Sequence, residues 1–316
     1  MKILMASPRG FCAGVEMAID TVQELIELIG TPLYVYHEIV HNKHVVERFV
    51  DQGVTFVEDI AEVPEGSTVV FSAHGVSPAV RAESEARNLR MIDATCPLVT
   101  KVHVEARRYA RMGKRILLVG HADHQEIKGT YGEAPDHMTI VESPADVEKL
   151  DFPPDTPMIY LTQTTLSVDD ANVIIDAIKR KYPDCKAPPK EDICYATTNR
   201  QQAVRDLAPQ ADLTLVVGSR NSSNSVRLTE ISQNTGTPGR LLDDARELEL
   251  DWFEGVNTVL ITAGASAPDD LVQGVVAWLQ EKFNAEIDPG TLVDEGMNFA
   301  LPVQLRILKH EMANPG

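Results

Sequence analysis

The sequence has few cysteines, few aromatic residues and no long apolar run, and each of these absences excludes a class of protein. Four cysteines in 316 residues are too few for a disulfide framework, which excludes a small disulfide-stapled secreted domain. No apolar segment approaches the length that spans a bilayer, and the N-terminus turns polar at residues 7–9, too early for a signal peptide. We therefore expect a cytoplasmic protein with no membrane partner.

Positive charge is also scarce, because 29 Lys and Arg residues stand against 47 Asp and Glu residues and give a formal net charge of −18. This charge argues against nucleic acid as the main partner. It does not exclude a small anionic ligand, because helix N-termini and local donors decide anion binding. Neither G-x-G-x-x-G nor G-x-x-x-x-G-K-[ST] occurs, so the sequence predicts no dinucleotide site and no P-loop.

The sequence does contain a repeated order of short apolar run, polar loop and helical period. Runs rich in Val, Ile and Leu without strict alternation are typical of strands covered on both faces. The predicted strands are residues 2–6, 32–36, 67–73, 90–94, 115–120, 157–162, 213–218 and 257–264. Helical periods cover residues 15–29, 97–113 and 167–182. The order predicts parallel α/β sheets, and its loss from Glu281 onward predicts a C-terminal extension.

Cys12, Cys96 and Cys194 each stand between a strand-like segment and a predicted helix, at spacings of 84 and 98 residues. Each spacing matches one small α/β unit of about 90 residues, so three such units could present three thiols to a common centre. The residues alone leave zinc, an iron–sulfur cluster or simple burial open, because C-x-x-C spacing is absent. Three ligands without an obvious fourth indicate an open coordination position, as in catalytic metal sites.

Polar side chains collect just beyond the predicted strands, which is where ligands bind in α/β sheets. They are His37, His41, His74, His121, His124, Glu126, Thr164, residues 222–225 and Ser266. The Ser and Asn residues at 222–225 exceed what one helix cap needs, and such donors beside a helix N-terminus suit a phosphate or diphosphate. Glu126 is a candidate proton donor, because semi-enclosure raises the pKa of a carboxyl group.

Nine sequence blocks then carry a family resemblance. In order from residue 8 to residue 269 they are PRGFCAGV, HEIVHN, FSAHGVS, DATCPLVTKVH, GHADHQE, TQTTLSVDD, DICYATTNRQ, GSRNSSNS and AGASAPD. These blocks closely resemble the 4-hydroxy-3-methylbut-2-enyl diphosphate reductases (the IspH/LytB family), which catalyse the last step of the methylerythritol phosphate route to isoprenoids. The resemblance is weakest toward the C-terminus.

The resemblance implies a particular α/β fold. Three similar small parallel-sheet α/β lobes would form a pseudo-threefold trefoil around a central cavity, with a C-terminal tail. Lobe one would be residues 14–96, lobe two residues 97–193, and lobe three residues 1–13 together with residues 194–280. Residues 281–316 would be the C-terminal extension, covering the cavity or packing on a lobe.

The resemblance also implies the site. Cys12, Cys96 and Cys194 would hold one 4Fe–4S cluster whose open fourth iron binds the substrate hydroxyl, and Cys185 receives no role. The diphosphate would be bound by His41, His74, His124, Ser222, Ser223, Asn224 and Ser266. Thr164 would contact the substrate hydroxyl and Glu126 would supply or relay a proton, so the catalytic set is Glu126, Thr164 and His124.

The implied activity is reductive dehydroxylation of 4-hydroxy-3-methylbut-2-enyl diphosphate to isopentenyl diphosphate and dimethylallyl diphosphate. Electrons would come from a donor protein of the ferredoxin or flavodoxin type. Two alternatives stay open. One is a zinc-dependent hydrolase of a small phosphate ester with Glu126 as the base. The other is a non-catalytic diphosphate-binding protein whose cysteines are simply buried.

Overall fold

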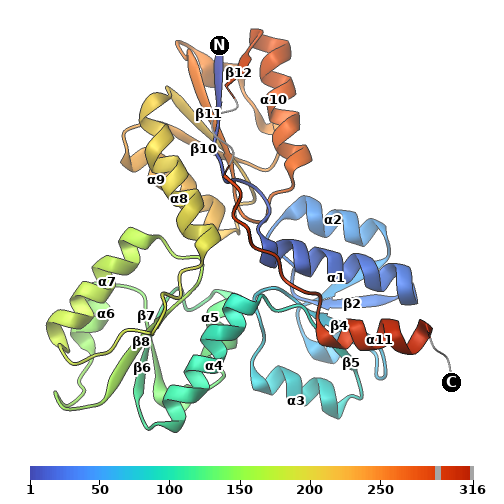
Figure 1. Ribbon diagram of the computed structural model, residues 1–316, viewed down its shortest axis with the longest axis vertical. Coiled ribbons are helices and arrows are strands. Elements are labelled where there is room, and N and C mark those ends of the chain that lie inside the picture. The colour runs from blue at the N-terminus through green and yellow to red at the C-terminus, as the bar shows by residue number, and fades with distance from the viewer. Residues whose placement is uncertain (289–292, 314–316) are drawn as a thin grey trace. The chain divides into compact units, whose positions relative to one another are not determined.

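The computed structural model describes residues 1–288 and 293–313, which belong to two compact units (Figure 1). Unit 1 consists of Met1–Val15, His41–Arg48 and Tyr195–Asn298. Unit 2 consists of Glu16–Val40, Phe49–Cys194 and Phe299–Gly316. The described residues form three small sheets, one in unit 1 and two in unit 2, and all their strand pairs are parallel.

The sheet of unit 1 has five strands and places the N-terminal strand inside it. In sheet order the strands are β10 (Gly239–Leu242), β9 (Leu213–Val217), β11 (Thr258–Ala263), β1 (Lys2–Met5) and β12 (Glu286–Asp288). Ile3 pairs with Val259 of β11 on one side and with Ile287 of β12 on the other. The first strand of the chain is therefore held between two strands from its last third.

Helices cover both faces of this sheet, with α8 (Tyr195–Leu207) and α9 (Ser223–Asn234) on one face and α10 (Asp269–Phe283) on the other (Figure 1). Successive side chains of a strand point to opposite faces. Accordingly, Leu4 belongs to the core cluster that contains residues of α8 and α9, whereas Ile3 and Met5 belong to the cluster that contains residues of α10. Two buried faces explain why the inner strands β9, β11 and β1 are mostly apolar.

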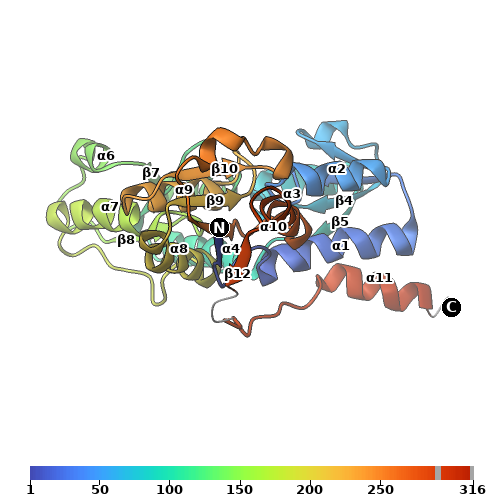
Figure 2. The same ribbon diagram turned by 90° about the horizontal axis from the view of Figure 1, so that it is seen from above.

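The first sheet of unit 2 has four strands. In sheet order they are β3 (Val54–Val57), β2 (Leu33–Tyr36), β4 (Thr68–Phe71) and β5 (Arg90–Asp93). The helices of this part of the chain are α1 (Ala13–Ile29), α2 (Lys43–Asp51) and α3 (Pro78–Ala86). The C-terminal helix α11 (Val303–Ala313) contacts β5 and lies along α1, where Lys309 Nζ is 2.6 Å from Glu24 Oε2 (Figures 1 and 2).

The second sheet of unit 2 has three strands, in the order β7 (Met138–Val141), β6 (Arg115–Val119) and β8 (Met158–Thr162). Its helices are α4 (Pro97–Arg111), α5 (Gln125–Tyr131), α6 (Pro144–Lys149) and α7 (Val168–Lys181). Leu117 and Val119 pack in the cluster that contains α6 and α7, while Ile116 and Leu118 pack in the cluster that contains α4 and α5. This sheet is therefore also covered on both faces.

The eight predicted strands are all present, and the predicted helices are confirmed as α1, α4 and α7. Ser167 caps α7, because its side chain accepts a hydrogen bond from the Asp170 N–H at 3.2 Å. Four strands were missed, namely β3, β7, β10 and β12, and each lies at the edge of its sheet. The expectation that the strand–helix order stops at Glu281 is wrong, because α10 continues to Phe283 and β12 joins the sheet of unit 1. The lobe boundaries remain a prediction.

In the described part of the chain no helix combines the length and the apolar character needed to cross a membrane.

Candidate active site

The polar residues to which the sequence assigns a binding or catalytic role form two groups, one in each unit. The acid group lies in unit 2 and consists of His74 after β4, His124 and Glu126 after β6, and Thr164 after β8. The donor group lies in unit 1 and consists of His41 before α2, Ser222, Ser223 and Asn224 after β9, and Ser266 after β11. Every member follows the carboxyl end of a parallel strand, and His41 follows β2, as expected for ligand sites in such sheets.

Glu126 and Thr164 are the centre of the acid group. The Thr164 N–H donates to Glu126 Oε1 at 2.6 Å, and Thr164 Oγ1 donates to Glu126 Oε2 at 2.9 Å. Glu126 is only 2% exposed. Burial raises the pKa of Glu126 to about 7, although both Thr164 hydrogen bonds act in the opposite direction. A carboxyl group with this pKa holds or releases a proton near neutral pH, as a general acid requires.

His124 is fixed by the start of α5, because its Nδ1 accepts a hydrogen bond from the Glu126 N–H at 3.2 Å. With Nδ1 as the acceptor, a neutral ring carries its proton on Nε2, which then faces away from the helix as a donor. The ring of His74 meets the ring of His124 edge to face, with centroids 5.8 Å apart. Two imidazoles so placed can offer ring N–H groups as donors to an anion.

His103 lies against the turn that carries His74. It was not singled out in the sequence. Its Nδ1 is 2.8 Å from Glu133 Oε1, while Arg107 Nη1 donates to Glu133 Oε2 at 2.9 Å. Burial alone would raise the pKa of Glu133, but the hydrogen bonds and charges of His103 and Arg107 outweigh burial and lower the pKa. The sequence signal was its position on α4, four residues after the buried Val99, which places His103 on the inward face.

Gly75 explains why His103 can approach the His74 turn so closely. Its φ of 79° is in the left-handed region, which disfavours residues with a Cβ. A Cβ at this position would lie 3.1 Å from His103 Nε2. The turn that carries His74 therefore rests directly on the His103 ring.

The donor group is held together by hydroxyl and amide hydrogen bonds. Ser222 caps α9 by accepting from the Ser225 N–H at 3.4 Å, and Ser225 Oγ donates to Ser222 Oγ at 3.1 Å. Ser266 Oγ donates to the His41 carbonyl at 2.8 Å. Ser223, the first residue of α9, is partly exposed. The group thus presents neutral polar side chains at a helix N-terminus, where backbone N–H dipoles favour anions.

Asn224 supplies the clearest donor of this group. Its Oδ1 accepts from the Ala265 N–H at 2.9 Å, which fixes the orientation of the amide. Its Nδ2 is buried and has no hydrogen-bond partner among the described residues. A buried amide N–H₂ without an acceptor is unfavourable, so a bound anion would satisfy a donor that the fold leaves open.

The three spaced cysteines all stand directly before a helix, as predicted. Cys12 precedes α1, Cys96 is the N-cap of α4, and Cys194 precedes α8. All three are partly exposed, whereas Cys185 is buried and burial raises the pKa of its thiol to about 11. Cysteine thiols bind metal as thiolates, so three cysteines that stand at helix starts are donors whose chemistry fits a thiolate-bound centre.

Backbone hydrogen bonds tie each cysteine to a strand end. The Cys12 N–H donates to Ala265 O at 3.3 Å and the Cys96 N–H to Ala73 O at 3.0 Å. The Cys194 N–H donates to Thr164 O at 3.1 Å. Thr164 therefore contacts both Glu126 and the backbone of Cys194.

Within residues 1–288 and 293–313 there is no group of three His, Cys, Asp or Glu side chains placed to hold a single metal ion. Cys12 belongs to unit 1, whereas Cys96 and Cys194 belong to unit 2. The meeting of the three thiols at one cofactor stays a prediction, as does the joining of the acid group and the donor group into one site.

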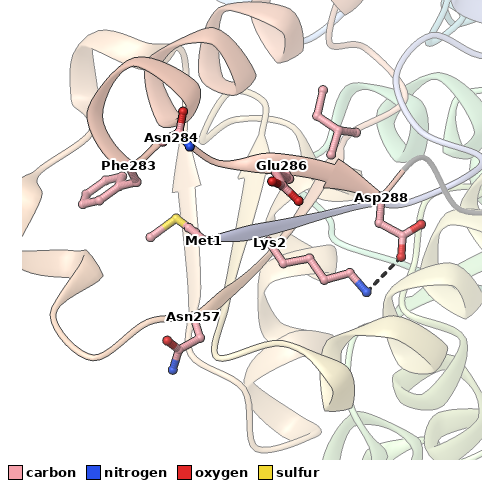
Figure 3. Close-up of a pocket in the computed structure, with 8 residues that line it drawn as sticks. Met1, Lys2, Asn257, Phe283, Asn284, Glu286 and Asp288 are labelled. Atoms are coloured by element: carbon pink, nitrogen blue, oxygen red, sulfur yellow. Dashed lines mark ion pairs between the residues drawn. The ribbon is translucent and has the colours of Figure 1, made fainter.

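A surface pocket of unit 1 lies away from these residues (Figure 3). Met1, Lys2 and Asn257 line it at the amino ends of β1 and β11, and Lys2 Nζ is 2.9 Å from Asp288 Oδ2. The donor group stands at the carboxyl ends of the same sheet. The pocket is therefore not part of the candidate site.

A family model described as LytB protein matches residues 3–280 of the chain. The chain belongs to the LytB protein family. Among similar proteins of this family, a 4-hydroxy-3-methylbut-2-enyl diphosphate reductase from Rhodopirellula baltica is 52% identical over 313 residues, covering 99% of this chain and 98% of the relative. A reductase of the same name from Nocardia farcinica is 53% identical and covers 96% of this chain and 91% of the relative.

Solved structures show the same likeness to LytB-family proteins. The structure of the E-1-hydroxy-2-methyl-but-2-enyl-4-diphosphate reductase from Plasmodium falciparum matches with a TM-score of 0.96 at 40% identity, covering 99% of both chains. The structure of (E)-4-hydroxy-3-methyl-but-2-enyl diphosphate reductase, the terminal enzyme of the non-mevalonate pathway, matches with a TM-score of 0.64 at 32% identity. It covers 89% of this chain and 100% of that one. The predicted family and the fold of three small parallel sheets are thus confirmed for this LytB-family chain.

Proposed function

We propose that this chain reductively dehydroxylates 4-hydroxy-3-methylbut-2-enyl diphosphate to isopentenyl diphosphate and dimethylallyl diphosphate. Its LytB-family relatives are named for reducing this diphosphate. The observation that carries the proposal is the set of hydrogen bonds made by Thr164. This residue donates two hydrogen bonds to the buried Glu126 and accepts one from Cys194. Thr164 therefore links Glu126, which can hold a proton, to Cys194, which is a candidate ligand of a redox cofactor.

The cofactor in this proposal is one 4Fe–4S cluster held by Cys12, Cys96 and Cys194, with its fourth iron open. When bound, the cluster supplies two electrons and a Lewis-acidic iron for the substrate hydroxyl. Three cysteine thiols that stand at helix starts and form no disulfide support this ligand set. The trefoil of three lobes around a central cavity belongs to the same proposal, because it would bring the thiols, the acid group and the donor group together.

The residues of the chain bind the substrate and move its protons. Glu126 holds a proton near neutral pH and has Thr164 Oγ1 as its hydrogen-bonded neighbour, so the pair can protonate the departing hydroxyl. The C–O bond breaks, two electrons and two protons enter, and the hydroxyl leaves as water. The second proton adds to carbon, and addition at either end of the allylic fragment gives one of the two products.

The diphosphate is the handle that orients the substrate in this proposal. His41, Ser222, Ser223, Asn224 and Ser266 of the donor group would bind it together with His74 and His124 of the acid group. Binding through a distant anionic group lets a small substrate be held in one orientation without contacts at the reacting carbon. An electron-donor protein of the ferredoxin or flavodoxin type and a cytoplasmic location complete the proposal.

The test is isolation of the full chain without oxygen, followed by iron and sulfide analysis and an assay for the two product diphosphates. We expect a broad visible absorbance that dithionite bleaches, together with turnover under a chemical reductant. Cys194→Ser should lose both, whereas Cys185→Ala, which removes the thiol assigned no role, should keep both.

Two other outcomes would overturn the proposal. A colourless protein that contains zinc and hydrolyses a phosphate ester would establish the hydrolase instead. Diphosphate binding without turnover, unchanged in Cys194→Ser, would establish a binding protein with structural cysteines.

A further inference from the structure

Arg200 is the largest fully buried side chain in the described part of the chain, although it is charged. It lies on α8 in unit 1, and its guanidinium donates to two backbone carbonyls that come directly before Cys12. Arg200 Nη2 is 2.7 Å from Gly10 O and 3.1 Å from Phe11 O, and Nε is 3.1 Å from Gly10 O. A buried guanidinium that directs three hydrogen bonds to one loop fixes the backbone of that loop.

The loop of residues 10–12 is held from its other side as well. The Gly10 N–H donates to Ala263 O at 3.2 Å, and the Cys12 N–H donates to Ala265 O. Gly10 has a φ of 64°, and a Cβ there would lie 3.2 Å from Ala267 O. The loop therefore lies between α8 and the segment that follows β11, with little room to move.

Glu295 completes the arrangement from the C-terminal segment. Its Oε2 is 3.1 Å from Arg200 Nη1, and its Oε1 accepts from Asn199 Nδ2 at 2.9 Å. Burying a guanidinium without an anion is strongly unfavourable, so Glu295 makes the burial of Arg200 tolerable.

We propose that Arg200 is the positioning residue for Cys12, holding the 10–12 loop through its carbonyls, and that Glu295 secures Arg200 from the C-terminal segment. The inference rests on the proposed function, because it takes Cys12 as a ligand of the cluster. Arg200 contacts neither substrate nor thiol in this role and acts through the backbone of residues 10 and 11.

Arg200→Lys tests the geometry, because lysine keeps the charge but loses the planar fork that reaches several carbonyls at once. In the anaerobically isolated full chain, we expect amide hydrogen exchange at residues 10–13 to quicken about tenfold, the scale of one hydrogen bond to a charged group. Loss of the visible absorbance to an iron chelator should quicken in parallel. Gln202→Ala, on the exposed face of the same helix, should change neither rate.

Two results of this experiment would overturn the proposal. Exchange and chelator rates equal to those of the unmodified chain would show that Arg200 does not hold the loop. Faster exchange throughout unit 1, with no excess at residues 10–13, would show that Arg200 is an ordinary core residue.

Glu295→Gln provides a second test of whether Arg200 and Glu295 hold the loop of residues 10–12. It is the deciding variant if Arg200→Lys does not fold. The amide keeps the acceptor for Asn199 but removes the charge. We expect faster exchange at residues 10–13 and a more positive reduction potential of the cluster, because a negative charge that opposes the added electron is gone. An unchanged potential together with unchanged exchange contradicts the role of Glu295. A chain that never binds iron would sink the proposed function, yet the exchange measurement would still test the hold on the loop.

Discussion

The acid group of unit 2 and the donor group of unit 1 use different chemistry. In unit 2 a carboxyl group is buried against Thr164 and its pKa is raised to about 7, beside two imidazoles. In unit 1 the side chains are mainly hydroxyls and an amide, ordered by hydrogen bonds to one another and to backbone. The first group can change its protonation near neutral pH, whereas the hydroxyls and the amide of the second cannot.

The contrast indicates a division of work within the proposed reaction. Neutral donors bind an anion at every physiological pH and need no counter-proton, so they suit a permanent diphosphate site. A buried acid is poor at binding an anion but suited to delivering a proton. We therefore expect substitution of Glu126 in unit 2 to act mainly on turnover and substitutions in the donor group of unit 1 to act mainly on affinity.

The largest expected effect is on turnover in Glu126→Gln. We expect kcat to fall about 10²- to 10⁴-fold, the usual contribution of a general acid, with the iron content retained and KM nearly unchanged. Steady-state kinetics under a chemical reductant measure both constants. Asp123→Asn, which removes an exposed carboxylate three residues earlier, is the control and should match the unmodified chain. Near-normal turnover in Glu126→Gln would remove Glu126 from the mechanism.

The same variant should gain stability at neutral pH. A glutamate carboxyl has an ordinary pKa of 4.5, whereas the pKa of Glu126 in the fold is about 7, so between these values the folded state binds more protons. The free energy of unfolding contributed by Glu126 therefore falls as pH rises from 4.5 to 7. Glu126→Gln does not titrate and so does not lose this stability. Its free energy of unfolding should exceed that of the unmodified chain by about 3 kcal/mol above about pH 7, and the difference should vanish near pH 4.5. Urea unfolding of both chains at two pH values measures it, and a pH-independent difference would contradict the raised pKa.

In unit 1, Asn224→Asp should act on affinity. The carboxylate keeps an acceptor for the Ala265 N–H but replaces the open Nδ2 donor with negative charge. We expect the Kd for the diphosphate substrate to rise about 10- to 100-fold, the scale of a lost hydrogen bond to a charged group. Calorimetric titration measures it. Asn234→Asp, at the exposed far end of the same helix, adds the same charge and should leave Kd unchanged. An equal rise in Kd in both variants would show that the added net charge, and not the lost donor, weakens binding.

The smallest effect is expected for His41→Ala. Ser266 bonds the backbone carbonyl of His41, so the substitution removes the imidazole without breaking the donor group. We expect substrate affinity to weaken by about tenfold or less, since one hydrogen bond contributes on this scale. The matched control is His37→Asn, since Asn tolerates the positive φ of this residue. A fall in kcat without a change in affinity would contradict the expectation that the donor group of unit 1 acts on binding.

The interior strands could be predicted from the sequence because both of their faces are buried. Strands such as β9 and β11 are mostly apolar and almost entirely buried, whereas β3, β7, β10 and β12 at the sheet edges contain partly or fully exposed residues. Where an edge strand lacks an apolar run of its own, it is defined by its partner and its pattern is weak; the edge strands β5 and β8 carry such a run and could be predicted. β12, with the sequence EID, shows this most clearly.

The site residues could be predicted where they follow predicted strands, and the supporting residues could not. Glu126 and Thr164 follow predicted strands, and the structure joins them by two hydrogen bonds. His103 and Arg200 lie within helices, where a polar residue on the inward face resembles any other buried helical residue. Their roles depend on which loop packs against the helix, and that is a tertiary property.

The place of β1 has a consequence for the order in which a ribosome-bound chain can complete its sheets. The two sheets of unit 2 close within residues 33–93 and 115–162, so each can form soon after its last strand emerges. β1 is made first, yet its neighbours are β11 and β12. β1 cannot pair until more than two hundred further residues have been synthesised, and contacts so distant in sequence form slowly. We expect the Cys12 segment that follows β1 to be among the last parts to settle, so that metal loading would follow release of the nearly complete chain.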